Sequence, residues 1–398
     1  MSAVPAQPAS GESLGGPAGG GDSAPSNVTA PPGPGRFAPA ELEAVLKRYD
    51  LGRVDSIREF IRGSAQAPKV VVGGPFGKFL IKRRAPGEDH PYQAAFCHAL
   101  QLHLSDRGFP APALVGTRDD NNSMLQMDGR VYEVSEFIEG DPFDRSPLAA
   151  RAAGAMLSRF HSGTRGFHCG FHTPADFAHG DERAEILLDR CLDRLSANRA
   201  VGGGADGVGA GGQRGATPDP VMLIDGLRAL WRGCVKDLDH SGITAWPRTL
   251  QHADWHPGNL VFAGQSVRAV LDYDSCRRGP RLIDLAGGTL HFSIVSVAAG
   301  GPPAAGTTDP STWPATPDEP RARAFLAGYQ SDQAPLNASE RAALAPAMAA
   351  AMLLESLPPV ASTGGFAGRP GDAFLEMVRR KSQWLMDNAG AVAELAAG

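Results

Sequence analysis

The residues best suited to chemistry lie in one short stretch, His252–Asn259, and at Asp272 farther along the chain. A carboxylate, Asp254, precedes an amide, Asn259, by five residues, and Asp272 follows that amide by 13 residues at the end of an apolar run. Pro257-Gly258 supplies the turn that folds the amide back toward the first carboxylate. Phosphoryl transfer needs such a set, because one carboxylate takes the proton of the acceptor hydroxyl while an amide and a second carboxylate hold Mg²⁺ on the phosphates.

Two other interpretations of this stretch compete with phosphoryl transfer. A single Asp or Asn after a strand is usually a turn residue or a helix cap, but several such features in one short window favour a functional set. His252, Asp254 and His256 are also residue types that bind zinc. A zinc site explains neither Asn259 nor the spacing to Asp272, and no further histidine cluster follows.

The elements that must position this stretch form two blocks, of which the first covers residues 37–140. Its periodicity predicts helices over 39–49 and 91–106, a strand over 57–61, a hairpin of strands 70–72 and 78–82, and a strand over 131–137. We therefore expect an α+β lobe built on a small antiparallel sheet.

The second block, residues 141–398, is mainly helical. Helices are predicted over 148–161, 184–197, 220–237, 282–297, 322–330, 336–355 and 372–395, with short strands over 249–252, 259–262 and 267–272. Residues 1–36, 202–220 and 300–320 consist largely of Gly, Pro, Ala and Ser. We expect a disordered tail and two low-complexity insertions there, because such segments cannot bury enough apolar area to offset the entropy of ordering.

Composition limits the classes of partner and location. The formal net charge of −5 argues against a nucleic acid or an anionic membrane held by global charge. Five widely spaced cysteines without a Cys-x-x-Cys pair are typical of reduced cytosolic thiols. No signal-peptide pattern is visible, and the longest apolar stretch, 342–354, contains Pro346 and is too short to span a bilayer. We expect a cytoplasmic protein whose oligomeric state is open.

The run His-Ala-Asp-Trp-His-Pro-Gly-Asn-Leu, followed by Leu-Asp-Tyr-Asp and then Arg-Leu-Ile-Asp-Leu-Ala, resembles the aminoglycoside phosphotransferase and choline kinase superfamily. That superfamily includes homoserine-kinase-like small-molecule kinases. The resemblance extends from roughly Asp50 to the C-terminus outside the low-complexity segments, and it is strongest between Leu250 and Ala286. It implies a two-lobed protein-kinase-like fold that binds ATP and Mg²⁺ in the cleft.

The resemblance assigns roles to five residues in the second block. Asp254 matches the catalytic base, and His252 matches the histidine that braces the catalytic loop. Asn259 and Asp272 match the two Mg²⁺ ligands. Asp284 matches an aspartate that anchors the loop from the following helix, which is a structural role.

The resemblance also implies nucleotide contacts in the first block, at Lys82, Gly63, Ser64, Glu136, Phe137 and Ile138. Lys82 ends a Phe-Leu-Ile-Lys strand and matches the lysine that contacts the α- and β-phosphates. Residues 63–69 take the place of the loop that covers the phosphates. Residues 136–138 match the hinge whose backbone meets the adenine.

Two features depart from the family pattern. The helix after the lysine strand normally offers a glutamate to pair with that lysine, and residues 91–106 contain none. The polar candidates to replace it are Gln93, His98 and Gln101, with Glu88 just upstream; alternatively, the phosphates alone hold the lysine. The loop at 63–69 also lacks the full glycine-rich pattern.

Several positions have two interpretations each. Either a contact with the acceptor or ordinary loop packing is expected at each of Trp255, His256, Asp274 and Arg278. Lys82-Arg83-Arg84 is either an anion site or, more commonly for three adjacent cations, a solvated patch. A helical stripe of Phe374, Val378, Lys381 and Leu385 predicts core packing, whereas Arg379-Arg380-Lys381 predicts a solvated face.

Together the observations predict an ATP- and Mg²⁺-dependent phosphotransferase that acts on the hydroxyl of a small molecule, with Asp254 as base. One alternative is a kinase-like module that binds a nucleotide or ligand without turnover, which the missing glutamate favours. Another is a protein Ser/Thr kinase of the same fold. Amino alcohols, sugars, homoserine-like amino acids and aminoglycosides all stay open as acceptors.

Overall fold

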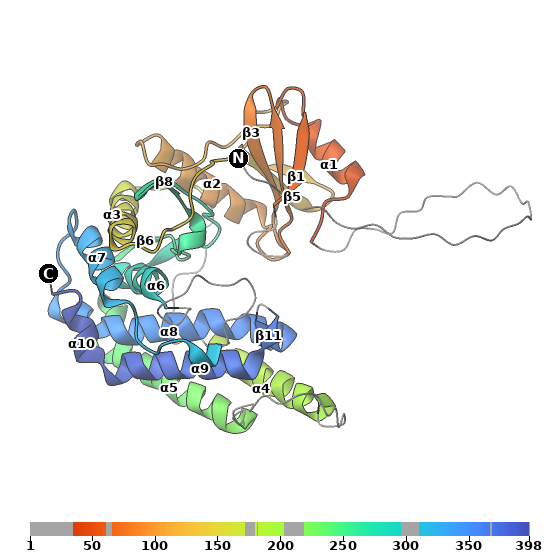
Figure 1. The fold of residues 1–398 in the computed structure, drawn as a ribbon. Helices are drawn as coiled ribbons and strands as arrows, with labels where there is room; N and C mark the ends of the chain where they lie inside the picture. The colour runs from red at the N-terminus through yellow and green to blue at the C-terminus, as the bar shows by residue number, and fades with distance from the viewer. Residues whose placement is uncertain are drawn as a thin grey trace, which may run out of the picture.

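The computed structural model describes residues 35–60, 66–171, 180, 182–202, 219–295, 310–366 and 368–397. The chain forms two lobes, a small one built on an antiparallel sheet and a larger one built mainly from helices (Figure 1). This confirms the α+β class. Positions 1–34 of the expected tail, 203–218 of the first insertion and 300–309 of the second lie outside the described residues.

The small lobe is a five-stranded antiparallel sheet in the order β1-β2-β3-β5-β4. Its elements are α1 (Pro39–Leu46), β1 (Ser56–Glu59), β2 (Lys69–Gly74), β3 (Gly77–Arg83), α2 (Pro91–Ser105), β4 (Leu125–Met127) and β5 (Arg130–Glu136). Val70, Val72, Ile81 and Val134 pack with Val45 of α1 into one hydrophobic core. They share a face because side chains alternate along a strand with a period of two.

Within the small lobe, β4 is a strand that the sequence analysis missed, as it also missed β9 (Arg277–Pro280) in the large lobe. Its three residues are too few to show a periodic pattern. It forms a hairpin with β5 through Asp128-Gly129, whose φ angles are 51° and 70°. Asp-Gly is a strong signal for this two-residue turn, because both central positions need positive φ. That dipeptide could have revealed the strand.

The pairing of β3 with β5 decides which side chains share a face of the sheet. Lys82 lies opposite Glu133, and Arg83 lies opposite Tyr132. Arg83 and Tyr132 both contact Glu41 of α1 on one face. Lys82 and Glu133 therefore point to the other face, toward the large lobe.

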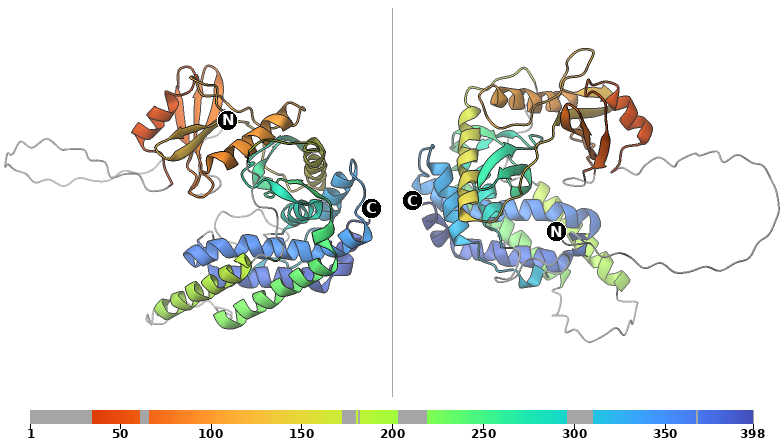
Figure 2. Two further views of the ribbon diagram at one scale, coloured as in Figure 1. Left: turned by 180° about the vertical axis from the view of Figure 1, so that it is seen from behind. Right: turned by 45° about the horizontal axis from the view of Figure 1, so that its top comes forward.

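The large lobe contains α3 (Pro147–Gly163), α4 (Arg183–Gly202), α5 (Pro220–His240), α6 (Arg281–Ser293), α7 (Glu319–Gln330), α8 (Ala338–Thr363), α9 (Gly371–Asp387) and α10 (Ala389–Glu394). α8 and α9 run side by side with α4 and α5 packed against them (Figures 1 and 2). α3 crosses α7 closely at Gly154 and Gly328; a Cβ at Gly154 would lie 2.0 Å from the Phe325 carbonyl oxygen. The single helix expected over 372–395 is two helices, α9 and α10.

α8 has, among the described helices, the length and apolar composition of a membrane span. Of its most apolar window, 72% is buried inside the fold, which is the behaviour of a core helix. It packs against α4, α5, α6 and α9. The helix extends beyond the expected end at 355, through Pro358 and Pro359, to Thr363.

Two short antiparallel ribbons carry the candidate site. β6 (Arg248–Gln251) pairs with β9 (Arg277–Pro280), and β7 (Leu260–Ala263) pairs with β8 (Ser266–Val270). The backbone of Asp141 exchanges hydrogen bonds of 2.8 and 2.9 Å with that of Phe262 in β7. The chain is therefore tied to the second ribbon where it passes from β5 into the large lobe.

Part of the second expected insertion is packed against α9. Arg380 donates to the Trp313 carbonyl oxygen at 2.9 Å, and the Lys381 ammonium contacts that of Pro314. Lys381 is only 2% exposed, so the solvated face predicted for Arg379-Arg380-Lys381 is wrong at this position. The core stripe is confirmed, because Phe374, Val378 and Leu385 are buried with Lys381.

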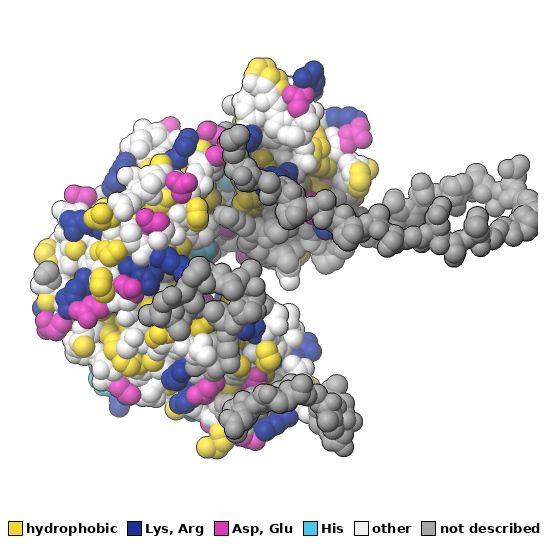
Figure 3. All heavy atoms as spheres, in the orientation of Figure 1, with side chains coloured by type: hydrophobic (Ala, Val, Ile, Leu, Met, Phe, Trp, Pro, Cys, Tyr) yellow, Lys and Arg dark blue, Asp and Glu magenta, His cyan; other side chains and the backbone are white. Residues whose placement is uncertain are grey.

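Charged side chains of both signs are interspersed over the face shown in Figure 3. On its described part, Lys and Arg alternate with Asp and Glu, and neither sign forms an extended field. This distribution agrees with the modest net charge of −5 and gives this face no strong field of one sign.

Candidate active site

Residues 252–259, which the family resemblance matches to a catalytic loop and which are called the catalytic loop below, begin where β6 ends and lead into β7. A 3₁₀ turn at Pro257–Asn259 reverses the chain. The side-chain amide of Asn259 donates to the backbone oxygen of Asp254 at 3.0 Å and to its Oδ2 at 2.6 Å. The turn therefore brings the amide and the carboxylate together, in the arrangement that their spacing predicts.

Asp254 leaves 42% of its side chain exposed, so an incoming hydroxyl can reach it. His256 Nδ1 accepts the N–H of Gly258 at 3.0 Å, which leaves Nε2 to carry the ring proton toward Asp254 Oδ1, 3.5 Å away. Burial opposes ionisation of Asp254, but its contacts with His256 and Asn259 lower its pKa to about 2. Asp254 is therefore ionised at neutral pH, as a proton acceptor must be.

Asp284, in the first turn of α6, anchors the start of the loop through hydrogen bonds to the loop backbone. Its carboxylate accepts the backbone N–H groups of His252 at 2.7 Å and Ala253 at 2.8 Å. His161 of α3 lies 3.0 Å from the same carboxylate and 2.8 Å from the Tyr329 hydroxyl. Ala253 has a φ of 60°, which is uncommon for a residue with a Cβ. The Asp284 contacts therefore stabilise a loop conformation that costs backbone strain.

His252 and Trp255 fill the space beneath the loop. His252 is fully buried, and its Nε2 lies 3.0 Å from the Leu271 carbonyl oxygen, so it ties the loop to the end of β8. Burial lowers its pKa. Its ring packs against Phe160 and Trp255, with centroids 5.6 and 5.3 Å away. Trp255 is 3% exposed, which places it in the core beneath the loop and away from an acceptor.

Asp272 follows β8 with a φ of 60°. The N–H of Leu271 donates to the Asn259 carbonyl oxygen at 2.8 Å, so the two candidate metal ligands are held close together. Burial opposes ionisation of Asp272, but the charges of Lys82 and Lys69 lower its pKa. Asn259 directs its NH₂ group to Asp254, which leaves the amide oxygen as a ligand. An amide oxygen and a carboxylate are donors that Mg²⁺ prefers, so these residues fit the metal that the resemblance implies.

Lys82 is buried and surrounded by carboxylates. Its ammonium lies 3.3 Å from Asp272 and 3.5 Å from Glu133, and it contacts Asp274. Three of the four candidates named from the sequence have other described partners. His98 contacts Glu133, Gln101 donates to the Pro112 carbonyl oxygen, and Glu88 offers its backbone oxygen to Arg84. The described contacts of Lys82 thus come from β5 and from the segment after β8.

The expectation of a solvated patch at Lys82-Arg83-Arg84 is wrong. The three residues are 6%, 8% and 2% exposed. Arg83 pairs with Glu41 at 2.7 Å, and Arg84 pairs with Glu133 at 2.9 Å. A buried cation needs a carboxylate partner, and strand pairing brings these partners from distant parts of the sequence.

The sequence analysis missed Glu133, and it named Arg84 only as part of the Lys82-Arg83-Arg84 patch. Glu133 stands opposite Lys82 in the register of β3 and β5, and Arg84 follows Lys82 by two positions, which puts it on the same face. The alternation along residues 131–135 places Glu133 on the face opposite Tyr132 and Val134. It does not show that Lys82 is its partner, because that requires the register of β3 and β5.

His291 and Glu355 extend the site on the side of His256, and they were also missed. The His256 and His291 rings are 5.7 Å apart, and His291 Nε2 lies 2.7 Å from Glu355. Burial opposes protonation of His291, but Glu355 raises its pKa. His291 follows Asp284 by seven residues, two helical turns along the same face of α6. That spacing was the available signal.

The remaining candidates form four groups, of which three lie within the described residues. Asp274 is paired with Lys82 and Arg84, and only 12% of its side chain is exposed. Arg278 lies in β9, where its backbone pairs with Leu250. Glu136 ends β5, and Phe137 and Ile138 begin the crossing to the large lobe, where the hinge is expected. Gly63 and Ser64 lie outside the described residues.

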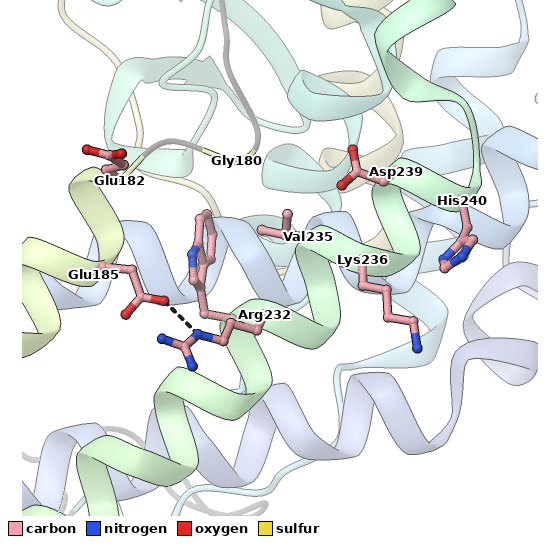
Figure 4. Close-up of a pocket in the computed structure, with 9 residues that line it drawn as sticks. Gly180, Glu182, Glu185, Arg232, Val235, Lys236, Asp239 and His240 are labelled. Atoms are coloured by element: carbon pink, nitrogen blue, oxygen red, sulfur yellow. Dashed lines mark hydrogen bonds and ion pairs between the residues drawn. The ribbon is translucent and has the colours of Figure 1, made fainter.

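A cavity of about 440 Å³ lies elsewhere, between α4 and α5 (Figure 4). Trp231 forms part of its wall, and a Glu185–Arg232 ion pair of 2.9 Å crosses one end. Glu182, Lys236 and Asp239 complete its mixed charge. No residue of the catalytic loop lines this cavity, so it is separate from the site described above.

Comparisons with known proteins show which family and fold this chain shares. A family model described as "Phosphotransferase enzyme family" matches residues 56–338. A homoserine kinase of Acidiphilium cryptum is 26% identical over 311 residues, which cover 76% of this chain and 80% of that protein.

Two solved structures show the same fold. The microcompartment-associated aminopropanol kinase aligns with a TM-score of 0.61 at 14% identity, covering 88% of this chain and 98% of that one. Amicoumacin kinase hAmiN, solved with AMP-PNP, Ca²⁺ and its ligand Ami, aligns with a TM-score of 0.59 at 12% identity, covering 87% and 92%. The expected two-lobed kinase-like fold is confirmed.

Proposed function

Because this chain belongs to the phosphotransferase enzyme family, we propose that it transfers the γ-phosphoryl group of ATP to a hydroxyl group of a small-molecule acceptor. The observation that supports this most directly is the convergence of Asp254, Asn259, Asp272 and Lys82 at the junction of the lobes. An accessible ionised carboxylate lies beside an amide that orients it, and a buried lysine faces the second carboxylate.

Asp254 is the proposed base. Its Oδ2 is held by the Asn259 amide, and its Oδ1 faces His256, so the carboxylate cannot rotate freely. With a pKa of about 2 it is ready to accept the proton of an acceptor hydroxyl as the phosphoryl group moves. Holding the base in one orientation lowers the entropic part of the barrier.

Asn259 and Asp272 would hold Mg²⁺, which neutralises phosphate charge when it is bound. Lys82 would contact the phosphates from the sheet side. Its charge is secure in the buried site, because Asp274 and Glu133 raise its pKa well above the ordinary value in spite of burial. Glu136–Ile138 would meet the adenine through the backbone, and Gly63 and Ser64 would cover the phosphates, as the family resemblance implies.

Homoserine is the first acceptor to test, because relatives that are 26% and 27% identical to this chain are homoserine kinases. Amino alcohols, sugars and aminoglycosides complete the panel. A thermal-shift screen with Mg²⁺-ATP identifies the acceptor, since a ligand that binds the native state raises its melting temperature. We place the reaction in the cytoplasm, with neither a nucleic acid nor a membrane as partner.

The alternative of an inert binding module rested on the absence of a helix glutamate. Lys82 has carboxylate partners in Glu133 and Asp274, so that argument loses its force. Transfer activity is therefore the function that we propose, and the following experiment tests it.

Asp254→Ala removes the proposed base. We expect the turnover rate to fall by about a thousandfold, the size usual for a general base, while Mg²⁺-ATP binding is kept. Product formation and nucleotide titration measure the two effects. Asp193→Ala, which removes an exposed aspartate of α4, is the control and should leave both unchanged. Full turnover in the Asp254→Ala protein would remove Asp254 from the mechanism.

A further inference from the structure

Four buried side chains of alternating charge form a closed ring where the lobes meet: Lys82, Glu133, Arg84 and Asp274, here the charge ring. Glu133 Oε1 lies 3.5 Å from Lys82 Nζ, and its Oε2 lies 2.9 Å from Arg84 Nη1. Asp274 Oδ1 lies 2.7 Å from Arg84 Nη2, and its Oδ2 contacts Lys82 Nζ. Each carboxylate therefore bridges both cations.

The members of the charge ring are strongly desolvated. Their side-chain exposures are 7% for Lys82, 0% for Arg84, 16% for Glu133 and 12% for Asp274. Burying a charge is unfavourable unless a partner of opposite charge compensates it. Burial opposes ionisation of Glu133, but Lys82 and Arg84 lower its pKa, whereas burial raises the pKa of Asp274 in spite of the same two cations.

The three carboxylates around Lys82 differ in where they come from. Asp272 and Asp274 stand on the segment after β8 in the large lobe, and Asp272 is the proposed metal ligand. Glu133 lies on β5, in the same sheet as β3 (Figure 1), and it is directly opposite Lys82 in the register of the two strands. Glu133 is thus the carboxylate that keeps its place beside the lysine whatever Asp272 binds.

A second set of contacts fixes Glu133 itself. His98 Nε2 of α2 lies 2.9 Å from Glu133 Oε2, and His98 Nδ1 lies 2.9 Å from the Ser123 hydroxyl. The Arg84 guanidinium binds the same Oε2. The carboxylate is therefore held by a strand, a helix and a cation, which leaves Oε1 directed at the lysine.

We propose that Glu133 is the positioning residue that sets Lys82 for the nucleotide phosphates, in place of a glutamate on α2. The inference rests on the proposed function, since it concerns the same nucleotide site. Without the charge of Glu133, Lys82 is repelled by Arg84 and by Lys69, its neighbour on β2. Its ammonium then keeps only the contacts with Asp272 and Asp274, which draw it away from the phosphates.

Glu133→Gln tests the proposal, with Glu41→Gln as the matched control. Glu41 is a buried carboxylate of the same lobe that binds Arg83, Arg130 and Tyr132 on the opposite face of the sheet, and its side chain is 12% exposed. We expect Glu133→Gln to raise the Kd for Mg²⁺-ATP by about tenfold or more, because Lys82 then loses the charge of an ion-pair partner in a buried site. Glu41→Gln should lower the melting temperature and leave that Kd within about twofold of wild type.

A carboxylate moved to the helix gives a second variant. His98→Glu combined with Glu133→Gln places the charge on α2, where the family carries its glutamate. We expect this double variant to recover most of the nucleotide affinity that Glu133→Gln loses, which a purely structural role of Glu133 does not predict. If Glu133→Gln does not fold, the folded double variant decides: near wild-type affinity supports the proposal, and lost affinity overturns it.

The outcomes separate this inference from the proposed function. A wild-type protein that binds no Mg²⁺-ATP overturns the proposed function. A wild-type protein that binds Mg²⁺-ATP, with a Glu133→Gln variant that binds it equally well, overturns only the role of Glu133. An equal loss of affinity in Glu41→Gln also overturns it, because the effect then reflects the stability of the lobe.

Discussion

The catalytic loop and the charge ring each hold charged side chains in fixed positions, but they bring those side chains together in different ways. In the loop, Asp254 and Asn259 are five positions apart and are joined by a turn between them. In the ring, Lys82 and Asp274 are 192 positions apart and meet only because two lobes are packed together. Local geometry can be predicted from a local pattern, whereas the ring depends on strand register and on the packing of the lobes.

The two regions also differ in how many groups hold each functional residue. At the start of the loop, one carboxylate, Asp284, accepts the backbone N–H groups of both His252 and Ala253. Lys82 has three carboxylates around it. Loss of one partner should therefore damage the loop far more than the ring.

Asp284→Ala should have the largest effect. It leaves two backbone N–H groups without their acceptor and His161 without its carboxylate, in a loop whose Ala253 has positive φ. We expect a loss of about 3–5 kcal/mol in the free energy of unfolding. The turnover rate should fall by about a hundredfold or more, because small displacements of a base are costly. Chemical denaturation and initial rates below the melting temperature measure both.

Asp318→Ala is the control for this variant. Asp318 caps the N-terminus of α7 by accepting the N–H of Arg321 at 3.0 Å, so its loss should cost about 1 kcal/mol. Turnover should not change. If Asp284→Ala lost stability but kept its turnover rate, the loop would not depend on a single anchor and the contrast with the ring would fail.

Asp274→Asn should have an intermediate effect, since it removes one carboxylate of the ring while Glu133 and Asp272 keep their contacts with Lys82. We expect the KM for ATP to rise by about tenfold and the KM for the acceptor to stay unchanged. Initial rates with both substrates varied measure this. Ser275→Ala, at an exposed neighbour, is the control. A higher KM for the acceptor alone would instead make Asp274 an acceptor contact, the other interpretation of the sequence.

The division between local and distant contacts also explains what the sequence could reveal. The two-lobed architecture and the positions of most helices follow from periodicity, and the turn at Pro257-Gly258 follows from residue type. The burial of Arg84 and the partners of Lys82 do not, because they require the register in which Lys82 faces Glu133. Lys381 was ambiguous for a related reason. A helical stripe shows which face is buried, but not that the carbonyl oxygens of Val295 and Pro314 lie there to receive an ammonium group.

Lys381 provides the smallest effect and the sharpest contrast with Lys82. Both lysines are almost fully buried, at 2% and 6% exposure, but carboxylates surround Lys82 and only backbone carbonyl oxygens receive Lys381 in its described hydrogen bonds. Burial lowers the pKa of Lys381 to about 8, whereas the neighbours of Lys82 raise its pKa. Lys381→Met should therefore leave turnover and the KM for ATP unchanged.

The pH dependence of stability tests this difference. Between pH 8 and pH 10.5 the unfolded wild-type chain holds a proton on Lys381 that the folded protein has released, so wild-type stability rises with pH in that interval. The Lys381→Met variant lacks this contribution of Lys381 to the pH dependence of stability. The difference in unfolding free energy should shift in favour of the wild type by about 2–3 kcal/mol across the interval, measured by denaturant titration at each pH. A constant difference would mean that Lys381 keeps its ordinary pKa and is solvated after all. In that case, carbonyl oxygens alone would not keep Lys381 buried, and Lys82 would owe its buried position to its carboxylate partners.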